Sequence, residues 1–85
     1  MNYTCYALYI DNDFVYNFEM WDSHNHAKVY VCDHLLFDGY FCEAVQRLHT
    51  EMRNVYNMFH TNGFNVAIKD RNGNTLDLEK TAFLS

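Results

Sequence analysis

The chain has 85 residues, 49% of them hydrophobic and 18% aromatic, with a formal net charge of −5. This length and composition predict one globular domain, residues 1–85, near the size at which a single core becomes only just sufficient. The net negative charge argues against direct binding to nucleic acid or to an anionic membrane surface, because both need clustered Lys and Arg.

The default compartment for this sequence is the cytoplasm. No apolar stretch approaches the ~20 residues that span a bilayer, and the first residues lack the basic start and the cleavage site of a signal peptide. We therefore expect Cys5, Cys32 and Cys42 to stay reduced.

The first half of the chain predicts three strands. Residues 4–10 and 14–21 are rich in β-branched and aromatic residues, and the segment Asp11–Asp13 between them favours a hairpin turn. A polar loop follows at 22–26, and residues 28–32 predict a third short strand.

The strongest periodic pattern predicts one long amphipathic helix that begins near Phe41. Asp38 is the expected N-cap, and Asn62-Gly63 is the expected stop. The apolar positions recur with helical spacing, at Phe41, Ala44, Val45, Leu48, Met52, Val55, Tyr56 and Phe59. We expect Val45, Leu48, Met52, Val55 and Phe59 to be buried against a sheet.

Two alternating segments after the helix predict a second hairpin. Phe64–Asp70 and Thr75–Glu79 flank the turn signal Arg71–Asn74, and Thr81–Ser85 reads as a loose tail. The order β-β-β-α-β-β predicts an α+β fold, in which a four- to five-stranded antiparallel sheet packs against one long helix on one face.

The two N-terminal strands are apolar on both faces, and a single helix covers only one of them. We therefore expect the other face to present an aromatic patch, rimmed by acids, to a partner or to a second copy of the chain. The alternative is that the loop at residues 33–40 folds over this patch.

Charge is divided unevenly along the chain. Residues 1–46 carry seven acids and one base, whereas residues 47–85 carry four acids and five bases. Acids interleaved with aromatic rings suit a surface that meets a macromolecule, because rings give contact area and charge steers the encounter. The predicted contact residues are Tyr9, Asp11, Asp13, Glu19, Trp21 and Asp22.

A second hypothesis is a small zinc protein, since His and Cys side chains that alternate along a strand share a face. Its ligands would be His24, His26, Cys32 and His34. The two pairs would meet only if the third strand were short, because its expected length separates them by about 17–20 Å. We expect no metal and no other cofactor.

The sequence does not indicate an enzyme. It contains no Gly-rich phosphate loop and no G-x-S-x-G motif, and its three glycines and single helix leave little room for a deep pocket. Cys42 and His49 share a helix face, but spacing alone does not make a nucleophile pair.

The favoured function is a non-enzymatic protein-binding module, such as an inhibitor that occludes a larger enzyme or nucleoprotein. One version of this hypothesis is mimicry of nucleic-acid phosphates by the carboxylates. A homo-oligomeric structural component, a homodimer in the simplest case, remains a further alternative that would use the same apolar face.

Overall fold

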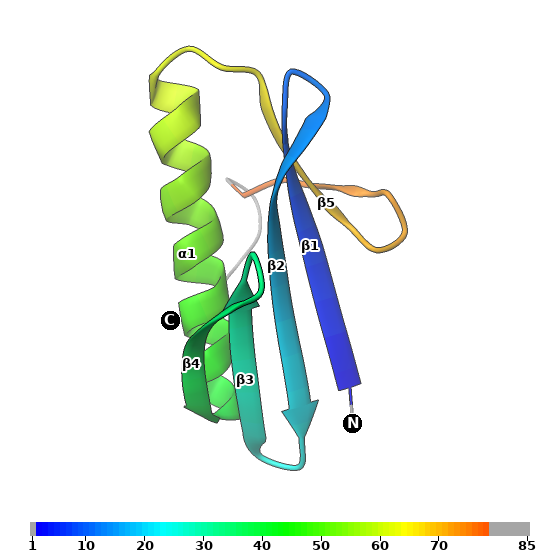
Figure 1. The fold of residues 1–85 in the computed structure, drawn as a ribbon, viewed down its shortest axis with the longest axis vertical. Coiled ribbons are helices and arrows are strands. Elements are labelled where there is room, and N and C mark those ends of the chain that lie inside the picture. Colours follow the sequence, from blue (N-terminus) through cyan, green and yellow to red (C-terminus); the bar gives the residue numbers. More distant parts are fainter. Residues whose placement is uncertain (1, 79–85) are drawn as a thin grey trace.

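The computed structural model describes residues 2–78 and shows one helix lying across one face of an antiparallel sheet (Figure 1). The α+β fold expected from the sequence is confirmed, with six strands in place of four or five. The elements are β1 (Asn2–Ile10), β2 (Asp13–Ser23), β3 (His26–Val31), β4 (His34–Tyr40), α1 (Phe41–Thr61), β5 (Val66–Asp70) and β6 (Thr75–Leu76).

The sheet has the strand order β4-β3-β2-β1-β5-β6, so the first strand of the chain lies inside the sheet. β1 pairs with β2 over its whole length but with β5 only from Tyr6 to Ile10. The four consecutive strands β1 to β4 form a meander, and α1 then carries the chain back across the sheet to β5. This return places β5 beside β1.

The core lies between α1 and the sheet, as the helical periodicity predicts. On the helix, Leu48 and Met52 are at most 1% exposed, and Val55 is also buried. Val45 and Phe59 are half-buried and pack against this core. The buried residues of the sheet share the opposite side of the interface: Leu8, Phe18, Met20, Ala27, Val29, Val66 and Ile68.

The predicted loop at residues 33–40 is wrong, because residues 34–40 form the edge strand β4. Cys32 and Asp33 both have positive φ, 49° and 68°, and they form a two-residue turn that leads directly from β3 into β4. Positive φ at both central residues is the type I′ hairpin geometry that matches strand twist. This segment therefore extends the sheet and does not cover its face.

The predicted N-cap at Asp38 is also wrong. Asp38 belongs to β4, where its carboxylate pairs with His26 of the neighbouring strand. The helix follows the strand without a loop, and its N-cap is Tyr40, which has extended backbone and no side-chain cap hydrogen bond. The predicted stop is confirmed, because α1 ends at Thr61 and Gly63 has a φ of 89°.

The second hairpin is confirmed but is shorter than expected. β5 begins at Val66, two residues after Phe64, whose ring instead lies edge-on to Phe59 with centroids 6.0 Å apart. β6 ends at Leu76, and the predicted strand end at Glu79 and the tail at 81–85 lie outside the described residues. Within residues 2–78, α1 lacks the apolar length that crossing a bilayer requires.

Candidate functional site

The sheet face opposite α1 is not covered by any element among residues 2–78, and we call it the open face. Side chains alternate across a strand, so residues of β1 and β2 next to the buried positions point to this face. Trp21 is 40% exposed there, and Phe14 beside the β1–β2 turn is 60% exposed. By strand pairing, the open face comprises Tyr3, Cys5, Ala7, Tyr9, Phe14, Asn17, Glu19, Trp21, Lys28, Tyr30, Leu35, Asp38, Ala67 and Lys69.

A hydrogen-bonded network lies at the centre of the open face. The Tyr3 hydroxyl donates to Glu19 at 2.8 Å, and Asn17 Nδ2 donates to the other carboxylate oxygen at 2.9 Å. The Cys5 thiol donates to Asn17 Oδ1 at 3.3 Å. The Cys5 side chain, burial and the bond to Glu19 together raise the pKa of the Tyr3 phenol above its ordinary value. Both oxygens of the Glu19 carboxylate therefore accept hydrogen bonds from neighbouring side chains on the open face.

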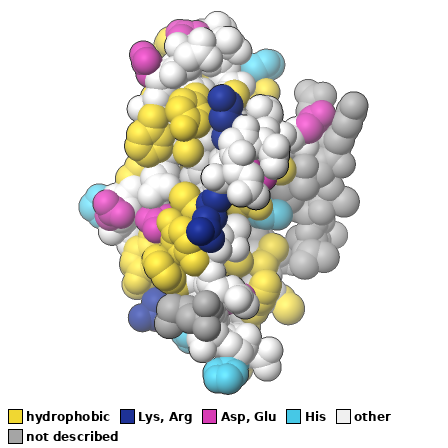
Figure 2. All heavy atoms as spheres, turned by 90° about the vertical axis from the view of Figure 1, so that its right-hand side faces the viewer, with side chains coloured by type: hydrophobic (Ala, Val, Ile, Leu, Met, Phe, Trp, Pro, Cys, Tyr) yellow, Lys and Arg dark blue, Asp and Glu magenta, His cyan; other side chains and the backbone are white. Residues whose placement is uncertain are grey.

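Basic side chains lie on the rings of the same face. The Arg71 guanidinium is 5.1 Å from the ring centroid of Tyr3, and the Lys69 ammonium is 5.1 Å from that of Tyr9. These separations are within cation–π range. Figure 2 views the side where β1 and the β5–β6 hairpin lie, and there hydrophobic groups alternate with Lys and Arg side chains.

The charges differ from the acidic rim that we expected. On the open face the acids are Glu19, which accepts two hydrogen bonds, and Asp38, which pairs with His26. Lys28, Lys69 and Arg71 supply three bases to the same face. The open face is therefore not acidic, although the whole chain has a formal net charge of −5.

Three of the six predicted contact residues lie on the open face: Tyr9, Glu19 and Trp21. Tyr9 is near the β1–β2 turn, whereas Trp21 is opposite Tyr3 near the start of β1. At the usual rise of ~3.3 Å per residue, the two ends of this hairpin are more than about 20 Å apart. These residues therefore share a face without forming one cluster.

The three predicted Asp residues lie away from the centre of the open face. Asp11 has a φ of 51° in the β1–β2 turn, and Asp13 begins β2 beside it. Asp22 is opposite Ala27, which is buried, so its side chain is on the α1 side of the sheet. These three acids are thus divided between the two ends of the hairpin.

Sequence reasoning missed Tyr3, which lies on the open face, and Arg71, whose guanidinium lies over the Tyr3 ring. Alternation along β1 places Tyr3 with Cys5 and Tyr9, so the sequence contained a signal for that residue. Arg71 reaches Tyr3 only because β5 pairs with β1, and strand order is not visible in the sequence.

The candidate zinc ligands are not brought together. His24 and His26 lie at the β2–β3 turn, and Cys32 and His34 lie at the β3–β4 turn. β3, which begins at His26 itself, places five residues between His26 and Cys32 and so keeps the two pairs at opposite ends of the strand. Within residues 2–78, no three side chains of His, Cys, Asp or Glu are close enough to share a metal ion.

Cys42 and His49 do not form a nucleophile pair either. They are seven positions apart on α1, which corresponds to about 10 Å along the helix axis. Cys42 is exposed, whereas His49 is half-buried, and burial together with the nearby Arg53 lowers the pKa of its imidazole. The two side chains are too far apart for proton transfer.

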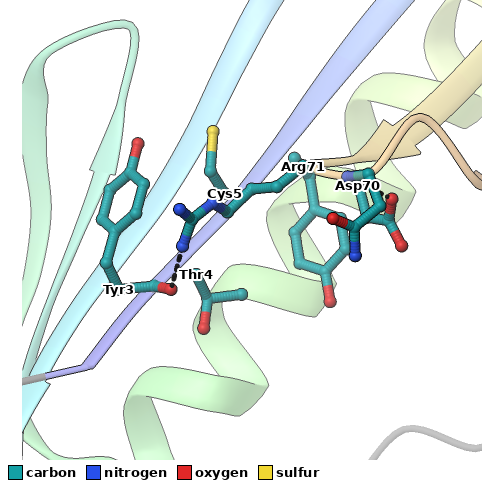
Figure 3. Close-up of a pocket in the computed structure, with 7 residues that line it drawn as sticks. Tyr3, Thr4, Cys5, Asp70 and Arg71 are labelled. Carbon is teal, nitrogen blue, oxygen red and sulfur yellow. Dashed lines mark hydrogen bonds between the residues drawn. The ribbon is translucent and has the colours of Figure 1, made fainter.

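A notch lies beside the open face where β5 ends. β5 pairs with β1 only as far as Tyr6, so Asn2–Cys5 has β2 on one side and no described strand on the other. A shallow depression of about 160 Å³ lies there, lined by Tyr3, Thr4, Cys5, Tyr6, Asp70, Arg71 and Asn72. In Figure 3 the Arg71 side chain extends across this depression to the Tyr3 carbonyl, to which Nη1 donates at 3.4 Å.

The Asp70 carboxylate fixes the turn that closes one end of the notch. It accepts hydrogen bonds from the backbone N–H groups of Asn72 and Asn74, both at 2.9 Å. The Asn74 backbone bond is the largest of several contacts that lower the pKa of Asp70 below its ordinary value.

No protein-family model matches the chain, and no curated protein or solved structure matches it significantly.

Proposed function

We propose that this chain is a small, non-enzymatic protein-binding module whose contact surface is the open face around Tyr3 and Trp21. The observation that carries the proposal is the exposure of Trp21 on a sheet face that α1 does not cover. Trp and Tyr give large, rigid contact areas, and they are enriched among the residues that dominate binding energy.

The polar groups of the open face support binding more than catalysis. Tyr3, Asn17 and Glu19 are joined by hydrogen bonds, which hold the Tyr3 ring in place against Trp21. A surface that is ordered before binding loses less side-chain entropy when a partner docks. Rings exposed on an open sheet face, outside any deep pocket, also suit a protein surface better than a small substrate.

The proposed mode of action is steric occlusion of a larger enzyme or nucleoprotein. Electrostatic mimicry of nucleic acid has less support, because Asp11 and Asp13 lie at the opposite end of the hairpin from Asp22. The exposed thiols of Cys32 and Cys42 fit a reducing compartment such as the cytoplasm. A second copy of the chain is the alternative partner for the same face.

Site-specific photo-crosslinking tests this proposal. A photoreactive phenylalanine analogue would replace Trp21 on the open face or, as a matched control, Met58, which is 49% exposed on α1. We expect position 21, but not position 58, to crosslink one defined protein in a lysate of the source cell. That protein should then bind the purified chain, and Trp21→Ala should weaken the complex.

Two outcomes would contradict the proposal. Equal crosslinking from positions 21 and 58 would show that the open face has no special role. Crosslinks from position 21 only to other copies of the chain, together with a dimeric mass in solution, would favour the homo-oligomer.

A further inference from the structure

We propose that the notch beside β1 binds an extended, acidic segment of the partner protein, which adds a strand to the sheet and places a carboxylate on Arg71. This inference rests on the proposed function, because it specifies the partner of the same surface. It depends on three features of the notch: a strand edge that no other described strand covers, a basic side chain that has no counter-ion within residues 2–78, and continuity with the open face.

The free edge follows from the hydrogen-bond alternation of β1. The N–H of Asp11 donates to the carbonyl of Asn65, and in antiparallel pairs every second residue bonds to the same neighbour. Tyr3 and Cys5 therefore direct their N–H and C=O groups to the side of β5. In this register Cys5 lies opposite Arg71, the first residue after β5, and Tyr3 lies beyond it. The Arg71 bond to the Tyr3 carbonyl confirms this direction. A segment added at this edge would pair with the Tyr3 N–H and replace the 3.4 Å Arg71 bond at the Tyr3 carbonyl, so that the guanidinium turns to the segment's carboxylate.

The charge complementarity comes from Arg71. Among the described residues it makes no ion pair, and its hydrogen bond of 3.4 Å to Tyr3 is longer than the usual ~2.7–3.2 Å. Its guanidinium therefore keeps donors that fit the two oxygens of a carboxylate. The carboxylate of the preceding residue, Asp70, accepts hydrogen bonds from the backbone of its own turn.

Because the notch adjoins the open face, a segment bound at the edge of β1 would also contact residues of that face. The Tyr3 ring lies between the Arg71 guanidinium and the Trp21 ring, at 5.1 Å and 4.2 Å from the ring centroid. A segment in the notch thus contacts the aromatic patch as well as the strand edge. A second copy fits less well, because Asn2–Cys5 carries no carboxylate and a self-paired edge would bring two Arg71 residues together.

A displayed library of random octapeptides, selected against the purified full-length chain, tests the proposal. We expect the enriched peptides to be rich in β-branched residues and to share an Asp or Glu. In nuclear magnetic resonance titrations they should shift the backbone amides of Tyr3 and Cys5 and slow the hydrogen exchange of these amides.

Two charge variants test the role of Arg71 in binding the selected peptides. Arg71→Gln should weaken binding about tenfold or more, since hydrogen bonds to charged groups are the strong ones. Arg47→Gln is the matched control, because it removes the same charge from an exposed position on α1, away from the open face, and it should change the dissociation constant less than about twofold. Circular dichroism would check that both variants fold.

The outcomes separate this inference from the proposed function. Binding of the selected peptides could depend on Trp21 but not on Arg71 and leave the amide signals of Tyr3 and Cys5 unchanged. That result would contradict binding in the notch but would agree with the open face as the contact surface. A library without any enriched peptide, or a dimer that protects these two amides, would also overturn the inference. If the photoreactive residue at position 21 crosslinked no protein, that result would contradict the proposed function itself.

Discussion

The rings of Tyr3 and Trp21 pack together with their centroids 4.2 Å apart and their planes at 44°. The two residues are direct partners in the register of β1 and β2. Arg71 lies on the same phenol ring, so one tyrosine connects β1, β2 and the turn after β5. The open face is organised around this pair.

Trp21→Ala should weaken the complex with the partner by ~2 kcal/mol or more, about a 30-fold loss of affinity, mainly through faster dissociation. The reason is that aromatic anchors at the centre of an interface carry most of the binding energy. Surface plasmon resonance would measure both rates. Met58→Ala on α1 is the control and should leave them unchanged, whereas equal effects of the two variants would place the interface elsewhere.

Leu48→Ala should lower the free energy of unfolding by roughly 2–5 kcal/mol, because it leaves a cavity between α1 and the sheet. Leu48 is 1% exposed. A denaturant titration measures the change. The exposed Thr50 on the same helix supplies the control, and Thr50→Ala should stay within about 0.5 kcal/mol of wild type. A loss below ~1 kcal/mol for Leu48→Ala would contradict the packing of α1.

The three thiols should react with a disulfide reagent at two different rates. Cys32 and Cys42 are exposed, whereas Cys5 is half-buried and its thiol donates to Asn17. Access controls thiol reactivity, so two equivalents should react quickly and one slowly. The spectrophotometric progress curve gives the two phases. Cys5→Ser should remove only the slow phase, and three equal rates would show that β1 and β2 do not shield Cys5.

The β5–β6 turn should lose stability at low pH because of Asp70. Its pKa is lowered in the folded state, so the carboxylate stabilises the turn above its ordinary value of 3.8. This contribution is lost as the pH falls below 3.8 and through the lower folded-state pKa. The amide signals of Asn72 and Asn74 should report the change, and Asp70→Asn should remove their pH dependence. An unchanged profile in Asp70→Asn would assign the transition to another group.

The parts of the fold that sequence predicted are those with local signals. Leu48, Met52 and Val55 repeat with helical spacing, and the buried face of α1 follows from that spacing alone. Asp11 and Asn12 both have positive φ, which their residue types tolerate, so the first hairpin was also predictable.

The missed parts depend on features that local patterns do not carry. The β3–β4 turn includes Cys32, which is not a typical turn residue, and so β4 was mistaken for a loop. The contact of Arg71 with Tyr3 depends on α1 returning the chain to the side of β1, which only tertiary packing determines. The sequence prediction therefore included Tyr9 and Trp21 of the candidate site but neither Tyr3 nor the bases of the face.

The position of β1 inside the sheet affects how the chain folds during synthesis. The meander β1–β4 leaves the ribosome before α1 and β5, and its hairpins are local enough to form at once. Until residues 66–70 emerge, the whole edge of β1 and the core face of the meander stay open to other chains. Folding intermediates of this protein should therefore be most prone to aggregation before β5 docks, and a chaperone that covers β1 would act in that interval.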